Sequence, residues 1–233
     1  MARARSILAA MEHTELFAAA LLDLSATMAA PLLPPDADPW LALPRIAGFL
    51  ASLLASPPPG YRLVAPGILA GEGCRISSRA ELLGPAILGP GTELRPGAYI
   101  RENVVVGARC VVGNSTELKN CILFDEAQAP HFNYVGDSIL GRGAHLGAGS
   151  ILSNLKSDKR EVVVRLPDGT AIRTGLVKFG AVLGDGAEIG CNAVCNPGSV
   201  VGRASRVYPL ASLRGFLSGG TILKADGSRR ALA

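Results

Sequence analysis

The sequence is poor in aromatic residues, which make up 5% of its 233 positions. It has no apolar run of the ~20 residues that a membrane-spanning helix needs, and its five cysteines form no Cys-x-x-Cys pair. The net charge is only +4, and four arginines near the two ends supply that excess: Arg3, Arg5, Arg229 and Arg230. A nearly neutral body argues against a nucleic-acid-binding stripe. We therefore expect a cytoplasmic protein that binds neither nucleic acid nor membrane and whose cysteines pack in the interior.

Glycine and proline are abundant by contrast, with 28 and 16 residues, and aliphatic residues return at every sixth position. The first run of this period is Ile76, Leu82, Leu88, Leu94, Ile100, Val106, Val112 and Leu118. A helix repeats every 3.6 residues and a strand alternates every two, so a six-residue period requires a short strand followed by a corner. Units this small stack on one another to bury their apolar faces. The sequence therefore predicts a mainly β solenoid with three sides to each coil.

The six-residue period returns twice in new phases. The second run is Tyr134, Leu140, Leu146 and Leu152, and the third is Val177, Leu183, Ile189, Cys195, Val201 and Val207. Two insertions at 123–133 and 153–176 would account for the changes of phase, and the second predicts a β-hairpin around the turn 167–170. We expect a solenoid domain over 61–215 and a C-terminal tail over 216–233.

Residues 1–60 have a helical pattern instead. Apolar residues at three- and four-residue spacing predict one helix over 5–30, and Asp38 followed by Pro39 predicts the start of a second. Two helices of this kind could close the open end of a solenoid, where strand edges are unpaired. We interpret this segment as an N-terminal α-helical cap.

Candidate functional residues lie in and around the repeats. Arg95 and Lys119 each follow an inward aliphatic residue, so both point outward, and His131 falls in the first insertion, where a break in a repeat array often carries a binding loop. The segment Gly147-Ala148-Gly149 would leave a flat surface for an extended ligand. Lys156, Lys159 and Arg160 could bind phosphate. Each feature also has a purely structural explanation: solvated charges, a loop histidine or a tight corner.

Taken together, these motifs resemble the acetyltransferase domain of bifunctional UDP-N-acetylglucosamine pyrophosphorylase / glucosamine-1-phosphate N-acetyltransferases and their archaeal sugar-1-phosphate nucleotidyltransferase relatives. The motifs are Leu94-Arg95, Glu117-Leu118-Lys119, His131, Tyr134-Val135-Gly136-Asp137, Gly147-Ala148-Gly149-Ser150 and Asn154. The resemblance implies a left-handed parallel β-helix, a homotrimer with sites between subunits, and acetyl-CoA as co-substrate without a metal. It also implies that His131 is the general base.

Other residues take roles from the same resemblance. It assigns Arg95, Lys119, Tyr134, Asn154, Lys159, Arg160 and His145 to the amino sugar phosphate, and Gly147, Ala148 and Gly149 to acetyl-CoA. His145 stands where the family usually has Asn, and Arg160 where it has Lys, which leaves the acceptor open between glucosamine 1-phosphate, galactosamine 1-phosphate and a nucleotide-linked amino sugar. The loop of a nucleotidyltransferase domain is not found in the sequence.

Two other classes of function remain open. One is a non-catalytic β-helix that binds a sugar phosphate or assembles with a partner. The other is a zinc hydratase on the same fold, which needs three histidines around the metal. His131 and His145 could reach a subunit boundary, whereas His13 lies in the helical segment.

Overall fold

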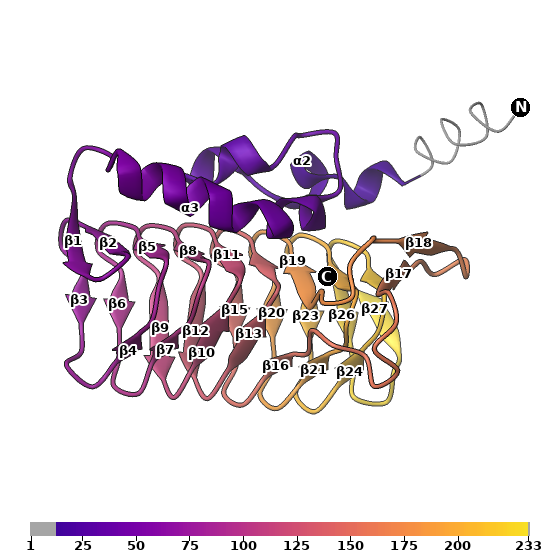
Figure 1. Cartoon of the computed structure of the whole chain (residues 1–233). Coiled ribbons are helices and arrows are strands. Elements are labelled where there is room, and N and C mark those ends of the chain that lie inside the picture. Colours follow the sequence, from indigo (N-terminus) through magenta and orange to yellow (C-terminus); the bar gives the residue numbers. More distant parts are fainter. Residues whose placement is uncertain (1–12, 233) are drawn as a thin grey trace, which may run out of the picture.

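The computed structural model describes residues 13–232, and most of that chain is a stack of short strands in three long sheets (Figure 1). Sheet A consists of β1 (Tyr61–Ala65), β2 (Ile68–Gly71), β5 (Ala86–Leu88), β8 (Val104–Val106), β11 (Cys121–Leu123), β14 (Ile139–Leu140), β19 (Ala181–Leu183), β22 (Ser199–Val201) and β25 (Phe216–Leu217). Sheet B consists of β3 (Arg75–Ile76), β6 (Glu93–Leu94), β9 (Val111–Asn114), β12 (Gln128–His131), β15 (His145–Leu146), β20 (Glu188–Ile189), β23 (Arg206–Val207), β26 (Thr221–Leu223) and β27 (Arg229–Ala231). Sheet C consists of β4 (Glu81–Leu82), β7 (Tyr99–Ile100), β10 (Glu117–Lys119), β13 (Tyr134–Gly136), β16 (Ile151–Leu152), β21 (Val194–Cys195) and β24 (Ser212–Leu213).

Successive coils pair in parallel, which confirms the predicted mainly β solenoid. Ala86 of β5 pairs with Val104 of β8, and Glu93 of β6 pairs with Val111 of β9, so that these coils take 18 residues. Aliphatic and small side chains from all three sheets fill the interior in one continuous core. Since the prism is narrow, this core needs no aromatic residue, which explains their scarcity in the sequence.

The predicted first insertion, 123–133, is wrong. These residues form a regular side of the solenoid, because β12 pairs with β9 and β15 in sheet B. The phase changes because two corners are one residue shorter: inward positions run from Leu118 to Leu123 and from Val135 to Leu140. Asn120 and Asp137 occupy these corners in the left-handed backbone region, with φ of 47° and 46°. Tyr134 consequently lies on the outer face of sheet C, and Val135 takes the inward position.

The second insertion is confirmed and contains the predicted hairpin. Ile139 pairs with Val182 across the insertion, and inside it β17 (Val163–Arg165) pairs antiparallel with β18 (Ala171–Arg173). The expected inward residue Val177 belongs to this excursion and is 50% exposed. In the segment 216–233, parallel pairing continues through β25 and β26, and β27 turns back antiparallel on β26.

The helical segment lies along the side of the solenoid, on the outer face of sheet A, and not across its end (Figure 1). It contains η1 (Thr14–Leu16), α2 (Ala18–Leu21), η2 (Leu24–Ala26), η3 (Ala30–Leu32), η4 (Pro39–Arg45) and α3 (Ile46–Ala55). The helix expected over 5–30 is replaced, from residue 13 onward, by these short turns; residues 5–12 lie outside the described residues. The second helix is confirmed, with Pro39 at its start, and the turn that holds Pro44 is 3-10 rather than α.

The position of the helical segment follows from a second apolar core. The outward residues of sheet A are aliphatic, for example Ile87, Val105 and Ile122, whereas those of the other two sheets are mostly polar. All three of these aliphatic residues are fully buried beneath the helices. Burial of apolar surface on this flank therefore holds short turns that would not be stable alone. None of the helices among residues 13–232 is long and apolar enough to cross a membrane.

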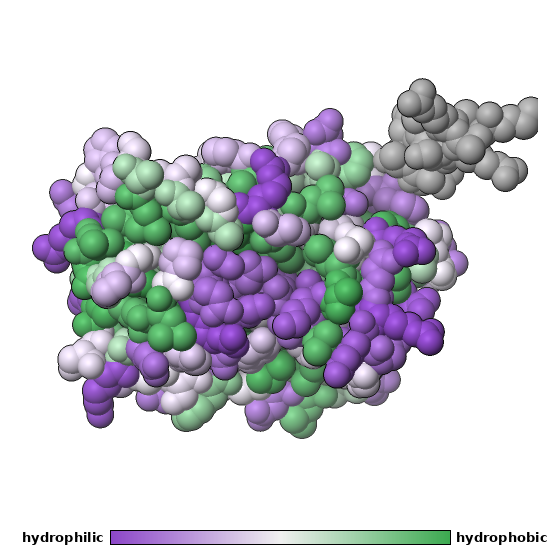
Figure 2. All heavy atoms as spheres, in the orientation of Figure 1, coloured by the Kyte–Doolittle hydropathy of each residue, from purple (hydrophilic) through white to green (hydrophobic). Residues whose placement is uncertain are grey.

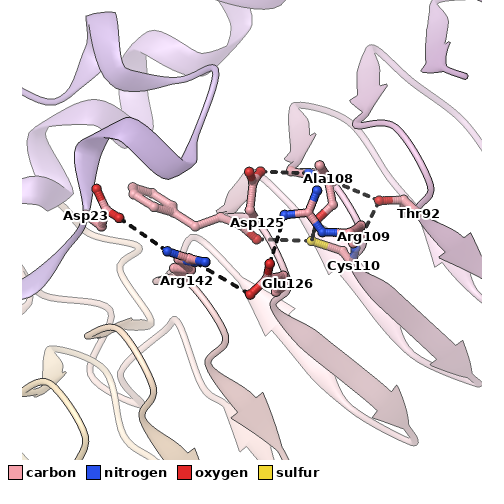
Figure 3. Close-up of polar contacts among 10 residues, drawn as sticks. Asp23, Thr92, Ala108, Arg109, Cys110, Asp125, Glu126 and Arg142 are labelled. Atoms are coloured by element: carbon pink, nitrogen blue, oxygen red, sulfur yellow. Dashed lines mark hydrogen bonds and ion pairs between the residues drawn. The ribbon is translucent and has the colours of Figure 1, made fainter.

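The helical segment is also bound to the corners between sheets A and B. The N–H groups of Asp125 and Asp185 donate to the carbonyls of Ala26 and Leu21, at 2.9 and 3.0 Å. Figure 3 shows the side chains at this boundary: Arg142 reaches both Asp23 and Glu126, at 3.7 and 3.5 Å. The ion pairs are exposed and contribute little, so the backbone bonds and the apolar contact define the position of the segment.

The end of the solenoid that begins with β1 is less well covered. Ile76, Ala80 and Leu82 are only partly buried there, and Figure 2 shows hydrophobic residues gathered at this end of the molecule. Leu63 and Leu83 are 62% and 51% exposed. The helical segment thus leaves the first coil open, in contrast to the end cap that the sequence suggested.

The cysteines mostly pack in the interior, as expected. Cys110, Cys121 and Cys195 are buried in the solenoid core. Burial raises the pKa of Cys110 and of Cys195 to about 12, which keeps both thiols protonated and unreactive. Cys191 is the exposed exception.

Candidate functional site

His131 lies at the end of β12, at the corner between sheets B and C, and its side chain is exposed. The backbone that carries it is fixed: its N–H donates to Asn133 Oδ1 at 3.1 Å, and its carbonyl accepts from the N–H of Gly149 at 3.1 Å. Asn133 is 3% exposed and donates from Nδ2 to the Gly147 carbonyl at 2.8 Å. The corner is therefore rigid while the imidazole faces solvent, the arrangement that a base acting on a bound substrate requires.

The segment Gly147-Ala148-Gly149 lies one coil beyond His131 on the same corner. The N–H of Gly147 donates to the Ile189 carbonyl at 2.6 Å, and the N–H of Gly149 donates to the His131 carbonyl. Within the described chain, the N–H of Ala148 has no hydrogen-bond partner. Gly149 has φ +74°, which glycine adopts without strain, and a Cβ there would require Asn192 Oδ1 to move. The corner thus presents an imidazole and a free backbone donor close together.

Three of the predicted sugar-phosphate residues meet in a second cluster, on sheet C. Asp137, which is 4% exposed, accepts from Asn154 Nδ2 and from Asn120 Nδ2, and lies 3.5 Å from Lys119 Nζ. Tyr134 extends over Gly136 towards Asn154, where a Cβ on Gly136 would lie 2.5 Å from the Tyr134 hydroxyl oxygen. Burial, with Glu117 and Asp137 nearby, raises the pKa of Tyr134 and keeps it neutral.

Asp137 organises this cluster, a role that the sequence analysis did not assign to it. It appears there only as the last residue of a motif, and nothing in the repeat pattern distinguishes it from a corner residue. The signal that could identify it is the one-residue shortening of the corner, which draws Lys119, Asn120 and Asn154 towards a single carboxylate.

Asp137→Asn is expected to lower the free energy of unfolding by about 1–3 kcal/mol, because a buried group loses charge-assisted hydrogen bonds and leaves donors without full acceptors. Chemical denaturation measures the change. Asp36→Asn is the matched control, since Asp36 is exposed and should give a change close to zero. Equal stability of the two variants would contradict the organising role.

The other predicted residues lie apart from both clusters. Arg95 is on sheet B and forms an ion pair with Glu93 at 3.2 Å, and His145, also on sheet B, has Nδ1 3.1 Å from Glu188 Oε2. Lys159 and Arg160 are in an exposed turn of the second insertion. One chain alone therefore does not bring Arg95, Lys159 or Arg160 to the His131 corner.

The described residues contain no group of three or more His, Cys, Asp or Glu side chains arranged to hold a metal ion. His131 and His145 lie on adjacent coils, because β12 pairs with β15, but neither has a third such side chain beside it in this part of the chain. The zinc-hydratase alternative therefore has no ligand set within residues 13–232.

Comparison with known proteins places the solenoid in a family. The family model described as the GMPPB C-terminal domain matches residues 82–201. The bifunctional sugar-1-phosphate nucleotidylyltransferase/acetyltransferase of Sulfurisphaera tokodaii is 33% identical over 114 residues, which are 49% of this chain and 28% of that protein. The bifunctional protein GlmU of Methanococcus vannielii is 40% identical over 110 residues, 47% of this chain and 26% of that protein.

The chain thus spans about a quarter of the length of these two relatives. Among solved structures, a mutant of AntD, an N-acyltransferase from Bacillus cereus in complex with dTDP and coenzyme A, aligns at a TM-score of 0.45 with 13% identity, over 75% of this chain and 90% of that one. The family match covers half of the sequence and agrees with the resemblance carried by its motifs. The chain belongs to the GMPPB C-terminal domain family, among relatives of the GlmU type.

Proposed function

We propose that this protein is a CoA-dependent N-acetyltransferase that acts on an amino sugar 1-phosphate. The observation that carries the proposal is the His131 corner, where His131 is exposed and the N–H of Ala148, on the adjacent coil, has no hydrogen-bond partner among residues 13–232. The names of the relatives, which include a sugar-1-phosphate nucleotidylyltransferase/acetyltransferase, support the same class of reaction.

His131 removes a proton from the sugar amine as the nitrogen attacks the thioester carbonyl, because only the free amine is nucleophilic. A histidine suits this step, since a neutral imidazole has a ring nitrogen that can accept a proton. The new C–N bond forms and the C–S bond of the thioester breaks, and the proton held by His131 passes to the departing sulfur. No covalent enzyme intermediate is required, consistent with the buried thiols of Cys110 and Cys195.

The N–H of Ala148 stabilises the oxyanion of the tetrahedral intermediate. Backbone donors fixed in advance are effective in this role because they need no reorganisation during the reaction. Gly147 and Gly149 have no side chain, so in this proposal the pantetheine arm of acetyl-CoA approaches the backbone on either side of Ala148.

The phosphate of the acceptor is held by Lys119, Tyr134 and Asn154, and Asp137 fixes the positions of Lys119 and Asn154. This cluster is on sheet C, whereas Arg95 and His145 are on sheet B. A homotrimer joins them, because sheet B of one subunit then faces sheet C of the next, and cyclic symmetry repeats the same pocket three times. The active site in this proposal is shared between subunits.

A thiol-release assay with acetyl-CoA tests the function directly. Glucosamine 1-phosphate, galactosamine 1-phosphate and nucleotide-linked amino sugars serve as acceptors, and glucose 1-phosphate, which lacks the amine, is the matched control. We expect thiol release with an amino sugar 1-phosphate and none with glucose 1-phosphate. Turnover only with the nucleotide-linked sugars would show that the acceptor belongs to that class. Binding of acetyl-CoA without turnover on any acceptor would show that the protein is a non-catalytic binding protein.

A further inference from the structure

A small basic pocket lies between the hairpin of the second insertion and the last coils of the solenoid. Its volume is about 150 Å³, and its lining consists of Lys156, Val163, Arg165, Pro197, Arg214 and Gly215. The three basic residues come from the start of the insertion, from β17 and from the corner after β24. Because these segments are distant in sequence, the pocket exists only in the folded chain.

The pocket carries an excess of positive charge. Lys156 Nζ lies 3.3 Å from Asp158 Oδ1 and donates to the Glu161 carbonyl at 3.1 Å, which fixes its position. Arg165 and Arg214 are exposed, line the same small space and take part in no ion pair among residues 13–232. Cations that line one space repel one another, and an anion between them relieves the repulsion. The lining therefore favours a negatively charged ligand.

The walls of the pocket are rigid because two glycines let the hairpin lie directly on the solenoid. Gly198 and Gly215 both have positive φ, 83° and 73°. A Cβ at Gly198 would meet the carbonyl oxygen of Val163, and one at Gly215 would collide with that of Arg165. Val162 and Val164 are fully buried in the second core, which anchors β17 from the other side. The backbone walls of the pocket are consequently in place before any ligand arrives.

We propose that this pocket is a binding site for the phosphate group of a small molecule. The volume is below the 300 Å³ at which pockets for whole drug-sized ligands begin, so it admits a phosphate but not the molecule that carries it. Two arginines and a lysine supply the planar and point-like donors that recognise phosphate oxygens. The site lies apart from the His131 corner and does not depend on the proposed acetyl transfer, since phosphate binding can be measured without turnover.

The test is titration calorimetry at low salt with inorganic phosphate as the probe. The double variant Arg165→Ala/Arg214→Ala is expected to bind phosphate at least about tenfold more weakly than the unmodified protein, because it loses two charge-assisted contacts. Arg206→Ala is the matched control: Arg206 is also exposed and lies outward on sheet B, away from the pocket lining. This control should bind phosphate as the unmodified protein does.

Gly215→Ala offers an independent variant that keeps every charge. It should displace β17 from the corner and weaken phosphate binding, with the fold checked by circular dichroism. Saturable binding that is unchanged in the double variant would overturn the proposal, and so would the absence of saturable binding in the unmodified protein. Titrations with glucosamine 1-phosphate, with CoA and with CoA that lacks its 3′-phosphate then identify the source of the phosphate. The ligand whose affinity falls in the double variant is the one that places its phosphate in the pocket.

Discussion

His131→Ala is expected to lower the rate of thiol release from acetyl-CoA by about 100- to 10,000-fold, the usual contribution of a positioned general base. The reason is that the alanine variant leaves the attacking amine without a group to take its proton. The measurement is kcat with the best acceptor from the thiol-release assay. KM for acetyl-CoA should change little, because Gly147, Ala148 and Gly149 are retained.

The same variant should fold normally, because the His131 side chain is exposed and makes no side-chain hydrogen bond within the described residues. Phe132→Ala is the matched control, since Phe132 is the adjacent residue and is 60% exposed. If His131→Ala were as active as the unmodified protein, His131 would not be the general base.

Trp40→Ala is expected to lower the free energy of unfolding by about 3–5 kcal/mol, the typical cost of removing a large buried aromatic side chain. Trp40 is fully buried, and its ring centroid lies 5.5 Å from that of Phe179. This pair joins the helical segment to the chain that returns from the second insertion. Urea denaturation followed by circular dichroism measures the loss.

Leu41→Ala provides the control for Trp40, because Leu41 is the next residue in η4 and is 49% exposed. Its effect should lie within about 0.5 kcal/mol. If the two variants lost the same stability, the contact between the helical segment and sheet A would not contribute as the second apolar core indicates.

The solenoid could be predicted because each coil repeats one local rule. An aliphatic residue every sixth position, followed by a corner, is determined by neighbours in sequence and needs no knowledge of distant contacts. The same simplicity caused the error at 123–133. A corner shortened by one residue at Asn120 or Asp137 changes the phase of the repeat as an inserted loop would, so phase alone cannot separate the two.

The position of the helical segment could not be predicted in the same way. Its apolar residues indicate that it packs against something, but a flank and an end of the solenoid both offer apolar surface. The information lies in sheet A, where Ile87, Val105 and Ile122 are outward residues that are nevertheless apolar. A sequence analysis that compared the outward positions of the three sides could have found it.

Only those residues of the candidate site that belong to a recognisable motif could be predicted. Lys119, Tyr134 and Asn154 do meet, and His131 does lie beside Gly149, but Asp137 and the donor of Ala148 emerge from hydrogen bonds that no spacing encodes. Arg165 and Arg214 show the limit most clearly. They share a pocket because the hairpin folds back onto Gly215. The hairpin and the corner at Gly215 are distant in sequence, and no sequence pattern links them.

The covered flank restricts how copies of this molecule can meet. Sheet A is hidden beneath the helical segment, whereas sheets B and C remain bare along most of their length. A tether, label or fused domain attached to the outer side of α3 would thus leave both bare flanks free. For single-molecule or surface-immobilised measurements, α3 is a point of attachment that keeps both flanks accessible to another copy.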